Sequence, residues 1–100
     1  MNPHILVVID NKINPDKYTK EQLKQNAYAA DDAAYAAYDA YDAAITAAAY
    51  YAADSAADHV YDADSAADDV YWLNQYFKHS GENKQNYINA INKDNKQWIN

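Results

Sequence analysis

The sequence predicts a mainly α-helical protein, and three observations support that prediction. Between residues 20 and 80, the 100-residue chain contains neither glycine nor proline, the residues that most often interrupt a helix. Alanine, the strongest helix former, is the most frequent residue there. Alanines also recur at alternating spacings of three and four residues, which allows neighbouring helices to approach closely. We therefore expect a single domain over residues 1–100, folded as a three-helix antiparallel bundle or a helical hairpin with alanine-rich seams.

The first 18 residues are the exception to this helical prediction. Residues 5–9 have the sequence Ile-Leu-Val-Val-Ile, and Asn14 and Pro15 follow shortly after. A largely β-branched run that leads into a turn signal is typical of a buried strand. Residues 1–18 are therefore predicted to form a β-strand or extended arm and a turn, which must pair or pack elsewhere because one strand cannot stand alone.

The first helix is predicted over residues 20–50. Thr19 and Gln22 have the spacing of a capping box, in which each side chain accepts a bond from the other's backbone N–H. On a helical wheel, the acidic sector rotates by about 90° between this segment and residues 53–77. A chain reversal near Tyr50–Ser55 explains that rotation more simply than one long helix through both segments, although both arrangements stay open.

Two further helices complete the predicted bundle. The second covers residues 54–79, with Asp54 or Ser55 as its N-cap. Gly81 ends it, since glycine tolerates the left-handed conformation that closes many helices. The third covers residues 82–99.

A ten-residue repeat in this region offers a different fold. Residues 53–62 recur with few changes as residues 63–72, and ten is twice the five-residue period of a quadrilateral β-solenoid. In a solenoid, Asp58 and Asp68 would point inward, which is unfavourable without partners. The abundance of alanine and the lack of glycine also favour the helix.

The net charge of −7 arises from one acidic block. Residues 27–77 hold ten aspartates and no lysine, the flanking segments carry a small excess of lysine, and arginine is absent. Such a block repels nucleic acid and anionic membranes and attracts a cationic partner. No apolar segment is long enough for a signal-peptide core or a membrane span, so we expect a soluble chain with no direct nucleic-acid or membrane contact.

A row of carboxylates on one face of the predicted second helix is the main candidate site. The simplest explanation of the row is a solvated face that keeps an alanine-rich chain in solution. A more specific hypothesis is that it imitates the phosphate backbone of DNA and binds the cationic groove of a nucleic-acid-binding protein. The candidate aspartates are Asp54, Asp58, Asp62, Asp64, Asp68 and Asp69. The candidate interface anchors are Tyr61, Trp72 and Tyr76.

Metal binding and catalysis have weaker support. His59 with Asp58 and Asp62 could touch a divalent ion, but a surface histidine between aspartates is usually no more than that. The segment from Asp62 starts like an EF-hand loop, yet it lacks the glycine at the sixth position and has Leu73 where the loop needs glutamate. No nucleophile motif accompanies any histidine. We expect no metal, no cofactor and no enzymatic activity.

Two other functions stay open. Tyrosines could stack on bases in a protein that sequesters nucleotide signals, but the tyrosine-rich block lacks the cationic donors that phosphates need. The chain could also be a purely structural helical assembly protein. Because an alanine core buries little area per residue, we expect self-association, most simply as a homodimer.

The sequence resembles small, alanine-, tyrosine- and aspartate-rich accessory proteins of large tailed phages. The resemblance lies in the Ile/Val-rich N-terminus, the segment Asn14–Leu23, and the runs of Ala-Ala-Tyr and Asp-Ala-Ala units. It implies a context in which small acidic proteins block host defences, sometimes by imitating DNA. It therefore suggests a non-enzymatic inhibitor in the host cytoplasm that binds a cationic defence protein such as a nuclease. No functional residue is carried over from it.

Overall fold

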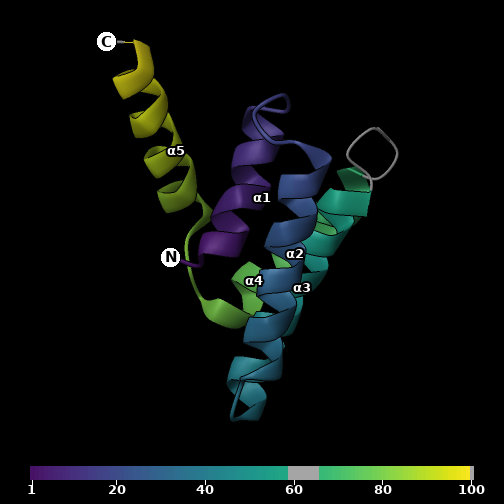
Figure 1. The fold of residues 1–100 in the computed structure, drawn as a ribbon. Coiled ribbons are helices and arrows are strands. Elements are labelled where there is room, and N and C mark those ends of the chain that lie inside the picture. The colour runs from purple at the N-terminus through teal and green to yellow at the C-terminus, as the bar shows by residue number, and fades with distance from the viewer. Residues whose placement is uncertain (59–65, 100) are drawn as a thin grey trace.

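The structure is a computed structural model (Figure 1), and it describes residues 1–58 and 66–99, with side chains for 1–58 and 68–93. The prediction of a mainly α-helical protein is confirmed for this part of the chain, which contains no strand. Its helices are α1 (Pro3–Ile13), α2 (Lys20–Tyr35), α3 (Ala40–Asp58), α4 (Ala66–Ser80) and α5 (Lys84–Ile99).

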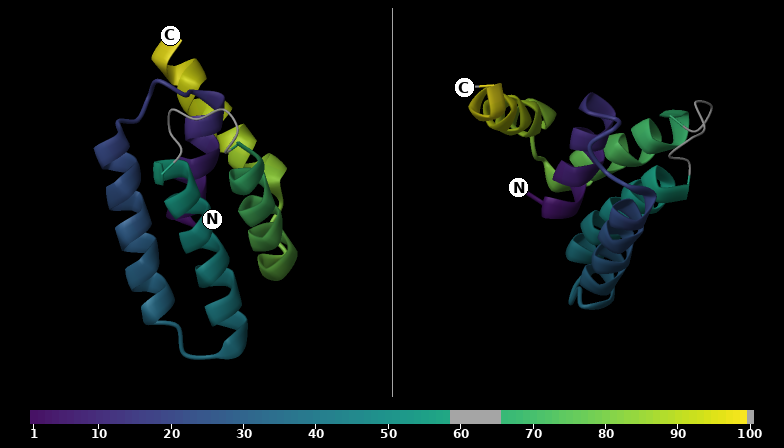
Figure 2. Two further views of the ribbon diagram at one scale, coloured as in Figure 1. Left: turned by 90° about the vertical axis from the view of Figure 1, so that its right-hand side faces the viewer. Right: turned by 45° about the horizontal axis from the view of Figure 1, so that its top comes forward.

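Helix α3 lies at the centre of the arrangement. Helices α2 and α3 form an antiparallel hairpin, α4 packs on α3 from the other side, and α1 packs against both α2 and α3. Helix α5 contacts α1 near its own beginning and then diverges from the other helices (Figures 1 and 2). The end of the hairpin at which α2 connects to α3 projects beyond the other helices, whereas its opposite end lies close to them (Figures 1 and 2).

The predicted N-terminal strand is wrong, because these residues form α1. Asn2 caps the helix: its side-chain oxygen accepts hydrogen bonds from the backbone N–H groups of His4 and Ile5, at 2.8 and 3.2 Å. Pro3 occupies the first turn, where its missing N–H costs nothing. Ile5, Val8 and Ile9 are buried at helical spacing, so burial outweighs the β preference of the branched side chains.

The predicted helix over residues 20–50 begins where expected but is two helices. Thr19 and Gln22 form the complete capping box. Helix α2 then ends at Tyr35, and α3 starts after Asp39, whose side chain accepts a hydrogen bond from the backbone N–H of Asp42 at 2.8 Å. An aspartate cap is thus sufficient to start a new helix without glycine or proline in the connection.

The predicted reversal near Tyr50–Ser55 is also wrong, since α3 continues through these residues to Asp58. The predicted second helix over residues 54–79 therefore corresponds to the end of α3 and to α4. Helix α4 ends at Ser80, and Gly81 has a φ of +73°, as the sequence predicts. The predicted third helix, residues 82–99, agrees with α5 to within two residues at its start.

An alanine-rich seam is present along α3, but most of the alternately spaced alanines that predict the seams are exposed, among them Ala29, Ala33, Ala36, Ala40 and Ala43. The seam is formed by alanines nearer the end of α3. Methyl groups there allow α2 and α4 to approach closely, but they fill little volume. Larger side chains from the other helices supply the bulk of the core. The buried alanines of α3 are Ala48, Ala49, Ala52, Ala53, Ala56 and Ala57. The larger buried apolar and aromatic side chains are Ile5, Val8, Ile9, Leu23, Leu73, Tyr76, Tyr87 and Ile91.

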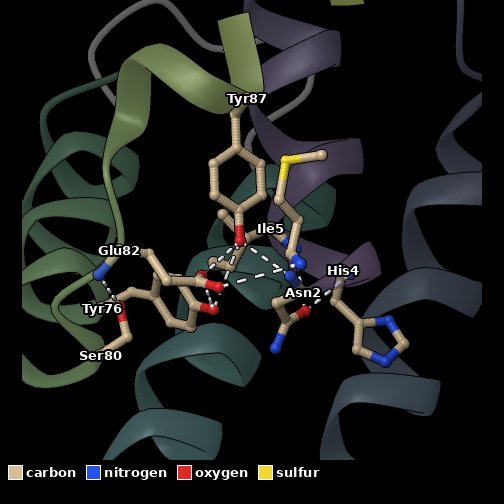
Figure 3. A network of polar contacts seen from close by, with 8 residues as sticks. Asn2, His4, Ile5, Tyr76, Ser80, Glu82 and Tyr87 are labelled. Atoms are coloured by element: carbon tan, nitrogen blue, oxygen red, sulfur yellow. Dashed lines mark hydrogen bonds and ion pairs between the residues drawn. The ribbon is translucent and has the colours of Figure 1, made fainter. Parts of the chain in front are cut away.

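The carboxylate of Glu82 joins the chain's N-terminus to α4 and α5 (Figure 3). One of its oxygens accepts hydrogen bonds from the hydroxyls of Tyr76 in α4 and Tyr87 in α5, the latter at 2.5 Å. Its other oxygen lies 3.9 Å from the Met1 ammonium. The Tyr87 hydroxyl also accepts a hydrogen bond from the backbone N–H of Asn2 at 2.8 Å. Three separate parts of the chain therefore meet at one carboxylate.

This network shifts the titration of its members in opposite directions. Burial alone would raise the pKa of Glu82, but the tyrosine hydrogen bonds and the N-terminal charge outweigh burial and lower the pKa below 4.5. Burial and the hydrogen bond to Glu82 raise the pKa values of Tyr76 and Tyr87. The charged carboxylate with two neutral phenols is therefore the stable state of the network.

We predict that Glu82→Gln lowers the free energy of unfolding by about 1–2 kcal/mol at neutral pH, because a neutral acceptor replaces a charged one. The carboxylate's contribution is fully present above pH 4.5 and is lost as the pH falls through its lower folded-state pKa. The variant should therefore lose less stability than the unmodified chain on further acidification. Urea unfolding followed by circular dichroism measures both effects.

Glu21→Gln is the matched control, because Glu21 is an exposed glutamate in the first turn of α2. It should have a smaller effect on the free energy of unfolding than Glu82→Gln at neutral pH, and it should change the acid dependence less. An acid profile of Glu82→Gln that superimposes on that of the unmodified chain would contradict the role given to the carboxylate.

Candidate partner-binding surface

The structure divides the predicted acidic face between two helices. Asp54 and Asp58 lie near the end of α3, whereas Asp68 lies in the first turn of α4. Asp58 and Asp68 are exposed, and Asp54 is half-buried. Three predicted site residues lie outside the described residues: Tyr61, Asp62 and Asp64.

Asp69 does not belong to the exposed face. Its residue is only 8% exposed, and its carboxylate lies 3.3 Å from the ammonium of Lys12 in α1. Helix α1 supplies the partner, which a wheel of α4 alone does not contain. The prediction that Asp69 is a surface carboxylate is therefore wrong, and its ion pair instead connects α1 to α4.

The predicted aromatic anchors also differ from expectation. Tyr76 is buried, and its hydroxyl donates a hydrogen bond to the carboxylate of Glu82. Tyr76 is therefore part of the core and not of the surface. Trp72 is half-buried, with its ring centroid 4.6 Å from that of Tyr51 in α3 and 4.9 Å from that of Tyr71. Tyr51 and Tyr71 are the exposed members of this cluster. Trp72 therefore contributes mainly to the contact between α3 and α4.

Carboxylates from both helices of the hairpin act on a common region. The half-buried phenol of Tyr50 in α3 has a raised pKa, chiefly because of the negative charge of Asp54. Burial adds to this effect, and smaller contributions come from Asp31 in α2 and from Asp58. The negative field thus extends across α2 and α3.

We call residues 27–58, which comprise α2 from Ala27 onward, the connection over residues 36–39 and α3, the acidic hairpin. From residue 27 to residue 58 it holds six aspartates and no lysine. Four of them, Asp32, Asp39, Asp42 and Asp58, are exposed, and the other two, Asp31 and Asp54, are half-buried.

The positive charges near the N-terminus, in contrast, are used within the chain. The ammonium of Lys17 lies 2.6 Å from the buried carboxylate of Asp10, which also accepts hydrogen bonds from Asn14 and Tyr18. Burial alone would raise the pKa of Asp10, but these hydrogen bonds lower it. Burial and the bond to Asp10 raise the pKa of Tyr18 to about 12. Lys12 and Lys17 are therefore paired with carboxylates near α1, whereas the chain after Lys24 carries exposed aspartates and no lysine as far as Asp58.

Sequence reasoning missed a group of exposed tyrosines at the end of the acidic hairpin. Tyr35, Tyr38 and Tyr41 are 90%, 100% and 63% exposed. The prediction of one continuous helix over residues 20–50 contained no turn between Tyr35 and Tyr41. The Asp39-Ala-Tyr-Asp42 pattern, with an aspartate cap and an acidic third position, is the signal that could have indicated the turn.

Residues 1–58 and 66–99 contain neither a metal-ligand cluster nor a membrane-spanning helix. No group of three histidine, cysteine, aspartate or glutamate side chains there could hold a metal ion. None of the helices in this part of the chain has both the length and the apolar character needed to cross a bilayer. What the described surface does offer is separated charge and exposed aromatic rings.

We predict that Asp54→Asn lowers the pKa of Tyr50 towards the ordinary value of 10.0, because the largest negative contribution to its surroundings is removed. An alkaline titration of the tyrosine ring carbons by NMR, with Tyr50→Phe to assign the resonance, measures the change. Asp42→Asn is the control, because Asp42 does not contribute to the raised pKa of Tyr50. Equal shifts in the two variants would show that the field at Tyr50 does not come from Asp54.

The chain was compared with known proteins in three ways. No protein-family model matches it, and neither a curated protein nor a solved structure does.

Proposed function

We propose that this protein is a non-enzymatic inhibitor that binds a cationic, nucleic-acid-binding protein through the acidic hairpin and the adjoining start of α4. The observation that carries the proposal is the separation of charge. Four exposed aspartates lie on a hairpin that has no lysine between residues 27 and 58, while Lys12 and Lys17 are paired with carboxylates elsewhere.

Electrostatics explains why such a surface would compete with nucleic acid. A groove that binds DNA gains affinity by neutralising phosphates, and carboxylates fixed on helices can provide the same negative charge. Because the aspartates are on packed helices and not on a loose tail, little ordering is required on binding. The protein would thus occupy the groove and exclude DNA.

The proposed contact residues change relative to the sequence prediction. The proposed contacts keep three of the predicted aspartates, Asp54, Asp58 and Asp68. They now also include Asp32 and Asp42. Asp69 and Tyr76 are removed because they hold the fold together. Tyr61, Asp62 and Asp64 keep their proposed role on sequence grounds alone, and Trp72 acts at most by supporting Tyr51 and Tyr71.

The biological setting is part of the same proposal. The resemblance to accessory proteins of tailed phages suggests a bacterial host cytoplasm, and a DNA-binding defence protein such as a nuclease as the target. Nucleotide sequestration is less well supported, because the exposed tyrosines lie among aspartates and not among cationic groups.

Capture from a bacterial lysate tests the proposal when it is combined with competition by DNA. The chain is immobilised through its C-terminus, because the Met1 ammonium lies beside Glu82. We expect the retained proteins to be basic and to be released by added duplex DNA or by salt. Retention of proteins that duplex DNA does not displace would refute DNA mimicry.

Charge-matched variants make this experiment quantitative. The double variant Asp32→Asn with Asp42→Asn should reduce the amount of retained protein about fivefold. Each lost charge pair at an exposed position weakens the binding free energy by about 0.5 kcal/mol. Asp16→Asn with Glu21→Gln changes the net charge equally at exposed positions outside the acidic stretch. If both double variants reduce retention equally, net charge and not the hairpin is responsible.

A further inference from the structure

The end of the acidic hairpin has a composition unlike the rest of the surface. We call residues 35–41 the tyrosine turn. It projects beyond the ends of the neighbouring helices in Figures 1 and 2, opposite the end where α2 follows α1. Tyr38 is fully exposed and Tyr35 is 90% exposed. Large rings that are this accessible are typical of residues that become buried against a partner.

These tyrosines do not hold the turn together. Backbone hydrogen bonds close it, from Ala36 N–H to the Asp32 carbonyl at 3.2 Å and from Ala37 N–H to the Ala34 carbonyl at 3.3 Å. The side chain of Asp39 then caps α3. Within the described part of the chain, no ring contact involves Tyr35 or Tyr38. Removing their rings should therefore leave the hairpin intact.

The negative electrostatic potential around the turn favours binding of a cation. The carbonyl end of α2, which carries partial negative charge, faces the turn, and its last turn has no basic residue. Asp31 and Asp32 add two carboxylates at that same end. The positive end of α3 is also here, but Asp39 caps it and Asp42 lies in its first turn. Negative potential and exposed rings thus coincide.

We infer that the tyrosine turn forms the projecting end of the docking surface and binds arginine side chains of the cationic partner by stacking their guanidinium groups on Tyr35, Tyr38 and Tyr41. The inference rests on the proposed function and specifies the chemistry of its partner. Arginine is the cation that stacks best on aromatic faces, because the guanidinium is planar and weakly hydrated. The carboxylates of the neighbouring aspartates can accept hydrogen bonds from the guanidinium N–H groups at the same time.

Other occupants fit less well. Bases could stack on the tyrosines, but their phosphates would meet the carboxylates of Asp31 and Asp32, and an anionic membrane would be repelled in the same way. A second copy of this chain contains no arginine. A basic protein with surface arginines satisfies both the rings and the charge.

Two synthetic peptides of nine residues, all arginine or all lysine, serve as probes in a fluorescence anisotropy titration. We expect the unmodified chain to bind the arginine peptide more tightly. Tyr35→Ser with Tyr38→Ser should weaken arginine-peptide binding by about fivefold or more and lysine-peptide binding by less. Tyr35→Phe with Tyr38→Phe should keep the affinity, because the rings remain.

Tyr28→Ser is the control, since Tyr28 is exposed and lies outside the turn. Circular dichroism verifies that the helices persist. Equal losses in the two serine variants, or equal losses for both peptides, would overturn the inference while leaving the proposed function standing. If the unmodified chain binds neither the arginine peptide nor the lysine peptide, the result counts against the proposed function itself. Dissociation of a dimer by the turn variant, seen by sedimentation, would identify a second copy as the occupant and overturn the inference.

Discussion

The methyl surface of α3 is the constraint on which the rest of the structure depends. Alanines such as Ala49, Ala52 and Ala56 are buried, and α2, α4 and α1 all pack against the helix that carries them. Methyl groups bury little area, and a core of them alone would contribute little stability. The remaining volume must therefore be filled by larger side chains from the flanking helices. For this reason the most apolar segment of the chain, around Ile5 and Val8, lies inside as a helix.

Packing around α3 also determines where charge can be exposed. Helix α1 lies against the bundle with Lys12 directed to Asp69 and with Asp10 held by Lys17, so its charged groups are neutralised locally. At the chain's beginning, the Met1 ammonium meets Glu82. The acidic hairpin takes part in none of these three ion pairs. Its negative charge is consequently left on the surface by the same contacts that stabilise the fold.

Local signals in the sequence were sufficient where an element depends on its own residues. The capping box of Thr19 and Gln22 and the helix end at Gly81 are of this kind. The N-terminal strand was mistaken because β-branched propensity is weaker than burial, although Asn2 followed by Pro3 is a recognisable helix start. For the site, a helical wheel of one element could not show that a neighbouring helix covers Asp69. Which carboxylates are exposed is decided by contacts between elements that are distant in sequence.

The position of the tyrosine turn links stability to binding. Asp31 and Asp32 lie at the carbonyl end of α2. The helix dipole there disfavours each negative charge by about 0.3–1 kcal/mol. In the free protein, water and salt screen this repulsion. A bound guanidinium between those carboxylates and the rings would remove it, so the bound state regains stability that the free hairpin lacks. Residues that are unfavourable for the fold would thereby be favourable for the proposed complex.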